Sequence, residues 1–211
     1  SSSSFSSSQF PDEVDAKLSG QIPWKTSPWV ELSFATKQID LGELEEMKEP
    51  RIFKTHAVPR LFPCRNPQDA RVIYVARSPF DVALSLYHHL HDKHCFSYDG
   101  DLEHFIEHIY LPGVTDGGSH GKHIADWFDV THCQDIVASP QQGAMPRQIL
   151  WMFYEDMIQD PAREIQRLAS FLGIQCTESR AYKIASLTSF ETMRKAFESE
   201  FNSKDSPLRK R

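Results

Sequence analysis

The sequence predicts an α/β fold, a three-layer arrangement in which a central parallel sheet is covered by helices on both sides. Two continuous apolar runs, residues 71–76 and 148–154, have the composition of strands that are buried on both faces. A helical pattern follows each run, and such alternation of strand and helix is typical of parallel sheets. Ligands of these sheets bind at the carboxyl ends of the strands, so the residues that follow each run are the first candidates for a site.

Local signals predict the remaining elements. Residues 41–47 have a short helical pattern that ends before Pro50, residues 51–55 have strand character, and the prolines of residues 57–69 predict a loop. Ser78 and Pro79 suit a helix cap and a first helical position, and the helix that they open has one apolar face, formed by Ala83, Leu86, Tyr87 and Leu90. Further helices are expected at residues 101–109, 122–131, 161–172 (ending at Gly173), 178–185 and 189–197.

Length and composition limit the classes of protein. A chain of 211 residues predicts one domain, and we expect a flexible serine-rich segment over residues 1–20 followed by the domain over residues 21–211. The net charge of −6 disfavours nucleic acid as a partner. No apolar run approaches the roughly 18 residues of a membrane span, so no membrane partner is expected. Four widely spaced cysteines, interpreted as free thiols, and the lack of a cleavable signal predict a cytoplasmic protein, with two disulfides in a secreted protein as the alternative.

Arg77 is the first candidate binding residue. It leaves a predicted strand directly before a helix N-terminus, where backbone amides and the helix dipole favour an anion. Its guanidinium can donate two hydrogen bonds to a phosphate, and Ser85 lies two helical turns further on, where its hydroxyl can reach the same anion. The alternative is a surface arginine paired with Asp81 and a serine packed on the helix.

Lys54 and His56 follow the strand-like residues 51–55. A histidine can accept a proton near neutral pH, and a neighbouring lysine can neutralise negative charge on a transferred group. The alternative is that His56, one of ten histidines, only caps a strand. His104 and His108 have the i, i+4 spacing of metal ligands, but neither belongs to an H-E-x-x-H pattern and no cysteine completes a set, so no metal is expected.

Aromatic residues supply candidate contacts for a flat base. Tyr154 ends the third predicted strand, where its ring can contact a base or simply cover the sheet edge. Thr188, Phe190 and Met193 cluster near the C-terminus, where Phe190 can stack on a base while Thr188 donates a hydrogen bond. Ordinary helix packing explains the same cluster equally well.

Taken together, four segments resemble the cytosolic sulfotransferase family. They occur in the family's order, at residues 51–56, 73–85, 153–157 and 187–193, and the resemblance extends over roughly residues 28–197. It implies a fold like that of the P-loop-containing nucleotide hydrolases. It also implies an enzyme that transfers a sulfuryl group from 3′-phosphoadenosine 5′-phosphosulfate (PAPS) to a hydroxyl or amine of a small acceptor, without a metal.

The resemblance implies a role for each candidate residue. Arg77 and Ser85 would hold the 3′-phosphate of the donor, and His56 would be the general base that removes the acceptor proton. Lys54 would stabilise the transferring group, and Trp29 would lie near the acceptor pocket. The residues that would line the adenine are Tyr154, Thr188, Phe190 and Met193.

Two departures from the family pattern predict that the domain is incomplete at both ends. Residues 1–50 contain no match to the Lys-Ser-Gly-Thr-Thr-type loop that cradles the 5′-phosphosulfate, so we expect that loop upstream of the chain. Arg209 and Lys210 begin like the family's Arg-Lys-Gly segment, which closes over the 3′-phosphate, but Arg211 stands where glycine is expected. A solvated basic tail is the alternative for these residues.

A sulfotransferase is therefore the leading hypothesis for function. The main alternative is a sulfotransferase-like binding module that keeps the 3′-phosphoadenosine site without catalysis. A nucleotide-dependent phosphotransferase and a metal-dependent hydrolase are more distant alternatives. The expected partner is a small-molecule acceptor whose identity the loops do not reveal, and a homodimer is left open.

Overall fold

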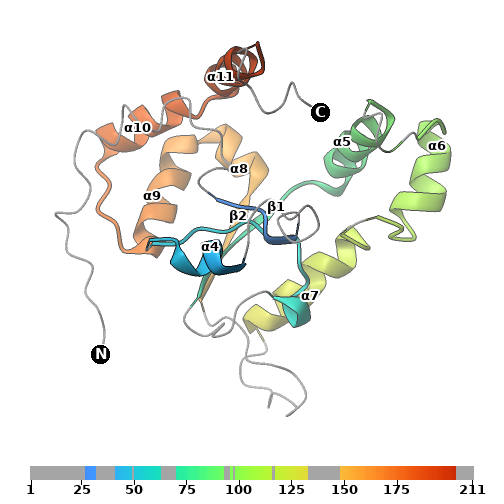
Figure 1. Cartoon of the computed structure of the whole chain (residues 1–211), viewed down its shortest axis with the longest axis horizontal. Helices are drawn as coiled ribbons and strands as arrows, with labels where there is room; N and C mark the ends of the chain where they lie inside the picture. Colours follow the sequence, from blue (N-terminus) through green and yellow to red (C-terminus); the bar gives the residue numbers. More distant parts are fainter. Residues whose placement is uncertain are drawn as a thin grey trace. The chain divides into compact units, whose positions relative to one another are not determined.

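The computed structural model describes residues 27–31, 41–48, 50–62, 70–92, 96, 98–115, 117–132 and 148–202. The chain divides into two compact units, and Figure 1 shows their helices and strands. The first unit comprises Ser1–Thr55 and Asp160–Arg211, and the second comprises His56–Gln159. The predicted serine-rich segment of residues 1–20, together with Arg209 and Lys210, lies outside the described residues.

The sheet of the second unit confirms both strand predictions. Strands β1 (Arg71–Ala76) and β2 (Gln148–Phe153) pair in parallel, from Arg71 beside Gln148 to Ala76 beside Phe153. Tyr154, which was expected to end the third predicted strand, instead begins helix α8 (Tyr154–Gln159). Because parallel strands end at the same edge of a sheet, the segments that begin at Arg77 and Tyr154 leave β1 and β2 next to each other.

One face of this sheet packs against helix α7 (His120–His132). The ring centroid of Tyr74 lies 4.3 Å from that of Trp151 and 5.9 Å from that of Trp127, which is 2% exposed. On the opposite face Ile73 and Val75 are 39% and 54% exposed. The prediction that this strand is buried on both faces is therefore wrong for β1, whose burial alternates as in a strand with one packed face.

Helices form most of the other described residues of the second unit, and the predicted helices 101–109 and 122–131 are confirmed with ends within two residues of the predicted ones. Asp101 caps the predicted helix 101–109, where its carboxylate accepts a hydrogen bond from the His104 amide at 2.8 Å. The second half of that helix winds as a π-helix rather than an α-helix. The helical elements are η1 (Pro59–Leu61), α5 (Pro79–Asp92), α6 (Leu102–Phe105) and η3 (Ile106–Tyr110), in addition to α7 and α8.

Local capping signals set the longest predicted helix of the first unit. Helix α9 (Pro161–Leu172) begins at Asp160, whose carboxylate accepts from the Arg163 amide at 3.1 Å. It ends at Gly173, whose φ of 74° lies in the left-handed region that favours glycine. The unit also contains α4 (Leu41–Glu46), α10 (Glu178–Leu187), which packs against α9, and α11 (Phe190–Asn202).

The predicted strand at residues 51–55 is wrong. Only Lys54 pairs there, in a single parallel bridge with Trp29. The Lys54 amide donates to the Pro28 carbonyl at 2.9 Å, and the Val30 amide donates to the Lys54 carbonyl at 2.9 Å. The pairing stops because Val30 already has helical backbone, which turns the partner segment away from an extended path. Within the described ranges, no helix is long and apolar enough to cross a membrane.

Candidate functional site

The structure brings Arg77 and Tyr154 together at the carboxyl ends of β1 and β2. The guanidinium carbon of Arg77 lies 4.5 Å from the centroid of the Tyr154 ring, a cation–π distance. The parallel register explains this contact. Ala76 is paired with Phe153, and Arg77 and Tyr154 are the residues that directly follow this pair. Two predicted site residues, 77 positions apart in the sequence, thus lie at one edge of the sheet.

Arg77 retains hydrogen-bonding capacity at this edge. Its Nε atom is buried and has no hydrogen-bond partner within the described part of the chain. A buried donor without an acceptor costs about 1–3 kcal/mol, and more when the group is charged. An anion held by the guanidinium would satisfy this donor, so the observed geometry fits the predicted phosphate contact.

Glu155 is a member of this site that the sequence reasoning missed. The Ser78 amide, directly before α5, donates to Glu155 Oε1 at 2.7 Å. That hydrogen bond, and to a lesser extent the positive charge of Arg77, lower the pKa of Glu155. The sequence feature that could have identified Glu155 was its position directly after the predicted strand of residues 148–154. An incoming phosphate would compete with this carboxylate for the positive end of α5.

Ser85 lies on α5 seven residues after Ser78, and its side chain is exposed. Seven residues correspond to two helical turns, which places Ser78 and Ser85 on the same face of the helix. The contact of Ser85 with the same anion as Arg77 stays a prediction.

The backbone of the candidate base His56 is held by helix α7. The carbonyl of His56 lies 3.2 Å from His123 Nε2, and the next carbonyl, of Ala57, accepts from Trp127 Nε1 at 3.2 Å. The other ring nitrogen of His123, Nδ1, is 2.8 Å from the Tyr74 hydroxyl. The side chain of His56 is exposed, as a base that meets an external acceptor must be. Sequence reasoning missed His123, although its i, i+4 spacing from Trp127 was visible.

The buried Tyr74 hydroxyl is expected to make the native state less stable at alkaline pH. Burial raises the pKa of Tyr74 from 10.0 to about 12. The native state therefore keeps this proton after the unfolded chain has lost it, so the stabilisation is complete below about pH 10 and is lost as the pH rises to about 12. We expect the free energy of unfolding, measured with urea, to fall as the pH rises from about 10 to about 12. After allowing for solvent screening, this fall should be on the order of 1 kcal/mol larger in the wild type than in Tyr74→Phe. Equal losses in the two proteins would contradict this assignment.

In the first unit, Lys54 contacts the segment that was predicted to lie near the acceptor pocket. The ammonium Nζ of Lys54 is 4.5 Å from the centroid of the Trp29 ring. The hydroxyl of Thr55 donates to the carboxylate of Glu31. The Lys54 side chain is itself exposed, so the cation–π contact orients the ammonium while leaving it accessible.

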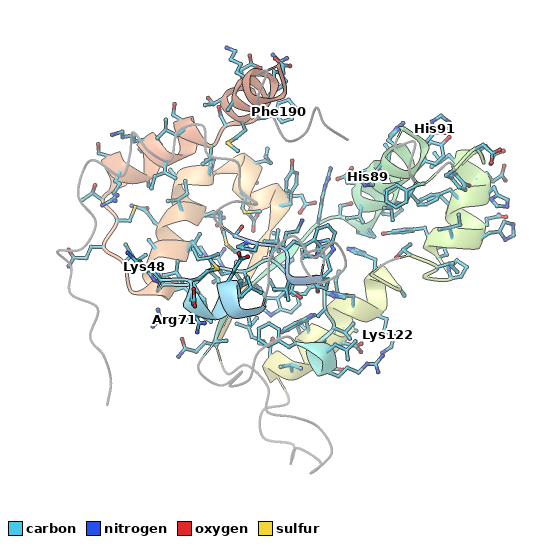
Figure 2. The ribbon with its side chains drawn as sticks, in the orientation of Figure 1. Lys48, Arg71, His89, His91, Lys122 and Phe190 are labelled. Atoms are coloured by element: carbon cyan, nitrogen blue, oxygen red, sulfur yellow. The ribbon has the colours of Figure 1, made fainter. Side chains whose placement is uncertain are left out.

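The three C-terminal candidates share the junction between α10 and α11. The Thr188 hydroxyl donates to the Ile184 carbonyl at 2.9 Å, which leaves its oxygen lone pairs as the available acceptors. Phe190 begins α11 and is 80% exposed (Figure 2), and Met193 is half-buried on the next turn. An exposed ring can stack on a base, but the adenine contacts of these three residues stay predictions.

The histidine pair that suggested a metal was also located. The rings of His104 and His108 lie with their centroids 4.7 Å apart, as their spacing predicts. Among the residues that the structure describes, no group of three histidine, cysteine, aspartate or glutamate side chains is arranged to hold a metal ion.

Solved structures establish the fold class. The structure of mouse sulfotransferase SULT7A1 complexed with PAP matches with a TM-score of 0.63 and 28% identity, over 79% of this chain and 53% of that one. Retinol dehydratase in a complex with retinol and PAP matches with a TM-score of 0.62 and 21% identity, over 89% of this chain and 52% of that one, and shows the fold alone. The fold is α/β with a central parallel sheet flanked by helices, like that of the P-loop-containing nucleotide hydrolases, as predicted.

Sequence comparisons identify the family. A family model described as the sulfotransferase domain matches residues 3–208. Sulfotransferase 1A1 of Bos taurus is 31% identical over 169 residues, which cover 80% of this chain and 52% of the relative. Human sulfotransferase 1E1 is 30% identical over 179 residues, which cover 84% of this chain and 56% of the relative. The chain belongs to the sulfotransferase domain family, and it spans about half the length of these relatives.

Proposed function

We propose that the protein transfers a sulfuryl group from PAPS to a hydroxyl or amine of a small acceptor. The observation that carries the proposal is the contact between Arg77 and Tyr154 at the carboxyl ends of two parallel strands. A cation with an unsatisfied buried donor suits a phosphate, and an aromatic ring beside it suits a nucleoside. Family membership and the similarity to a mouse sulfotransferase complexed with PAP, which is adenosine 3′,5′-bisphosphate, support the same ligand.

His56 is the proposed general base. Its imidazole accepts the proton of the acceptor group while the acceptor oxygen or nitrogen forms a bond to the sulfur of the donor. The bond between that sulfur and the phosphate oxygen breaks, and PAP leaves with the electron pair. Lys54 neutralises negative charge that develops on the transferred group, a role that its exposed ammonium can fill.

The remaining candidates are proposed to hold the nucleotide. Arg77 and Ser85 bind the 3′-phosphate, and Arg209 and Lys210 add positive charge to it. The residues proposed to line the adenine are Tyr154, Thr188, Phe190 and Met193. We assign these roles to one sulfotransferase domain over residues 21–211.

We also propose a cytoplasmic location. The free thiol of Cys176 and the family to which the chain belongs support it. The acceptor is proposed to be a small molecule, whereas nucleic acid and membrane are not proposed as partners. A homodimer would be detected by light scattering as twice the mass of the monomer.

The function is tested by incubating the protein with sulfur-labelled PAPS and a panel of phenols, steroids and amines. We expect label in at least one acceptor class and inhibition of the transfer by free PAP. Retention on immobilised PAP without transfer to any acceptor would instead establish the alternative, a binding module. A protein that neither transfers label nor is retained would overturn the proposed function.

A further inference from the structure

We propose that His123 is a positioning residue for the general base, because its ring, in the tautomer with the proton on Nε2, holds the main chain of His56. The inference rests on the proposed function of His56. His123, Tyr74 and His56 all belong to the second unit. None of the motifs that point to the family includes His123 or Tyr74 in a chemical role.

The two contacts of His123 define which nitrogen carries its proton. A main-chain carbonyl can only accept, so Nε2 donates to the His56 carbonyl across 3.2 Å. In a neutral imidazole the other nitrogen is then an acceptor, and the Tyr74 hydroxyl donates to Nδ1 across 2.8 Å. The result is one directed chain of hydrogen bonds, from the Tyr74 hydroxyl through the His123 ring to the backbone of the base.

The state of Tyr74 supports this direction. Burial raises the pKa of Tyr74 to about 12, so its hydroxyl keeps a proton to donate throughout the range in which enzymes work. The Tyr74 ring also lies 4.3 Å from Trp151 and 5.7 Å from His123, measured between ring centroids. The donor is thus held on β1 by packing as well as by its hydrogen bond.

A second contact from the same helix face strengthens the attachment. Trp127 lies one turn after His123 on α7, and its Nε1 donates to the Ala57 carbonyl across 3.2 Å. Trp127 is 2% exposed, and its ring meets Phe62 edge-on with the centroids 5.6 Å apart. Two consecutive carbonyls are therefore held by one rigid helix, which limits how far the base can move.

The chain of hydrogen bonds ties the base to the strand that ends at the anion site. Tyr74 belongs to β1. Arg77 lies three residues later and directly follows the end of that strand. The sheet therefore sets the backbone position of His56 as well as that of Arg77. A displacement of about 1 Å can cost about a hundredfold in rate, so loss of this support is expected to lower kcat without removing any group that touches a ligand.

A matched pair of variants separates positioning from packing. In His123→Asn the amide reaches only as far as Nδ1, so the contact with Tyr74 is kept and the bond to the His56 carbonyl is lost. In His123→Gln the amide nitrogen reaches the position of Nε2 and can donate to that carbonyl. We expect kcat to fall about ten- to a hundredfold in His123→Asn and to recover to within about threefold of wild type in His123→Gln. The KM for the acceptor and the affinity for PAP should stay unchanged in both.

Two results would overturn the proposal. Equal loss of kcat in the two variants, with Tm lowered equally, would show that the ring only fills space. Nitrogen-15 spectra of the wild-type ring test the geometry without turnover, because a proton on Nδ1 rather than Nε2 contradicts the directed chain. If the wild type shows the expected Nε2–H tautomer but neither transfers sulfuryl groups nor binds PAP, the proposed function fails and the hydrogen-bonded support stands.

Discussion

Replacing His56 with alanine is expected to reduce sulfuryl transfer by about a hundredfold to ten-thousandfold, the usual contribution of a general base. Without the imidazole, the acceptor must lose its proton to water, which is a poor base at neutral pH. The affinity for PAP should be unchanged, because no proposed nucleotide contact is removed. The measurements are initial rates with labelled PAPS and a titration with PAP on the same sample.

His108→Ala is the matched control for this variant. Its side chain is also exposed and belongs to the same unit, and within the described ranges its only ion pair is a 4.0 Å contact with Glu107. We expect His108→Ala to keep wild-type rates. A His56→Ala protein that retains more than about a tenth of wild-type activity would rule out His56 as the base, since so small a loss is below the range expected of one.

Replacing Arg77 with alanine is expected to weaken PAP binding by about ten- to a hundredfold. A hydrogen bond to a charged group contributes about 1.5–3 kcal/mol, and each 1.4 kcal/mol is a factor of ten in affinity. Arg77→Lys should restore only part of the loss, because an ammonium can neither donate two parallel bonds nor stack on Tyr154 as a planar cation. Isothermal titration calorimetry with PAP measures both effects.

Arg71→Ala provides the control, because Arg71 begins the strand that Arg77 follows. Its Nε donates to the Gln148 side chain at 3.2 Å, at the end of the sheet away from the candidate site (Arg71 is labelled in Figure 2). The loss of this arginine changes the net charge equally and should leave PAP binding intact. Similar affinities in Arg77→Ala and the wild type would remove Arg77 from the nucleotide site.

Features of the fold that depend on local sequence were predictable. Asp160, Pro161 and Gly173 mark the ends of α9 because capping involves residues three or four positions apart. The exposure of Ile73 and Val75 was not predictable, since an apolar strand has the same composition whether one or both of its faces are packed. The strand predicted at residues 51–55 is absent for a similar reason. Strand pairing depends on the backbone conformation of the partner segment, which local sequence at residues 51–55 does not reveal.

The candidate site shows the same division. The placement of Arg77 and Tyr154 at one edge of the sheet follows from the rule that parallel strands end together, so the sequence was sufficient to predict that placement, although not their cation–π contact. The same register brings Ser78 near Glu155, although it does not specify their hydrogen bond. The bond between Tyr74 and His123 joins a strand to a helix 49 residues later, and no spacing rule predicts it because tertiary packing alone brings these residues together.

The most direct test of the central claim, a 3′-phosphoadenosine site at the ends of β1 and β2, compares two nucleotides. The protein is titrated by calorimetry with adenosine 3′,5′-bisphosphate and with adenosine 5′-monophosphate. These two nucleotides differ only in the 3′-phosphate. We predict at least about tenfold tighter binding of the bisphosphate by the wild type, and a loss of most of this preference in Arg77→Ala. Equal affinity of the wild type for the two nucleotides, or no binding of either, would contradict the account.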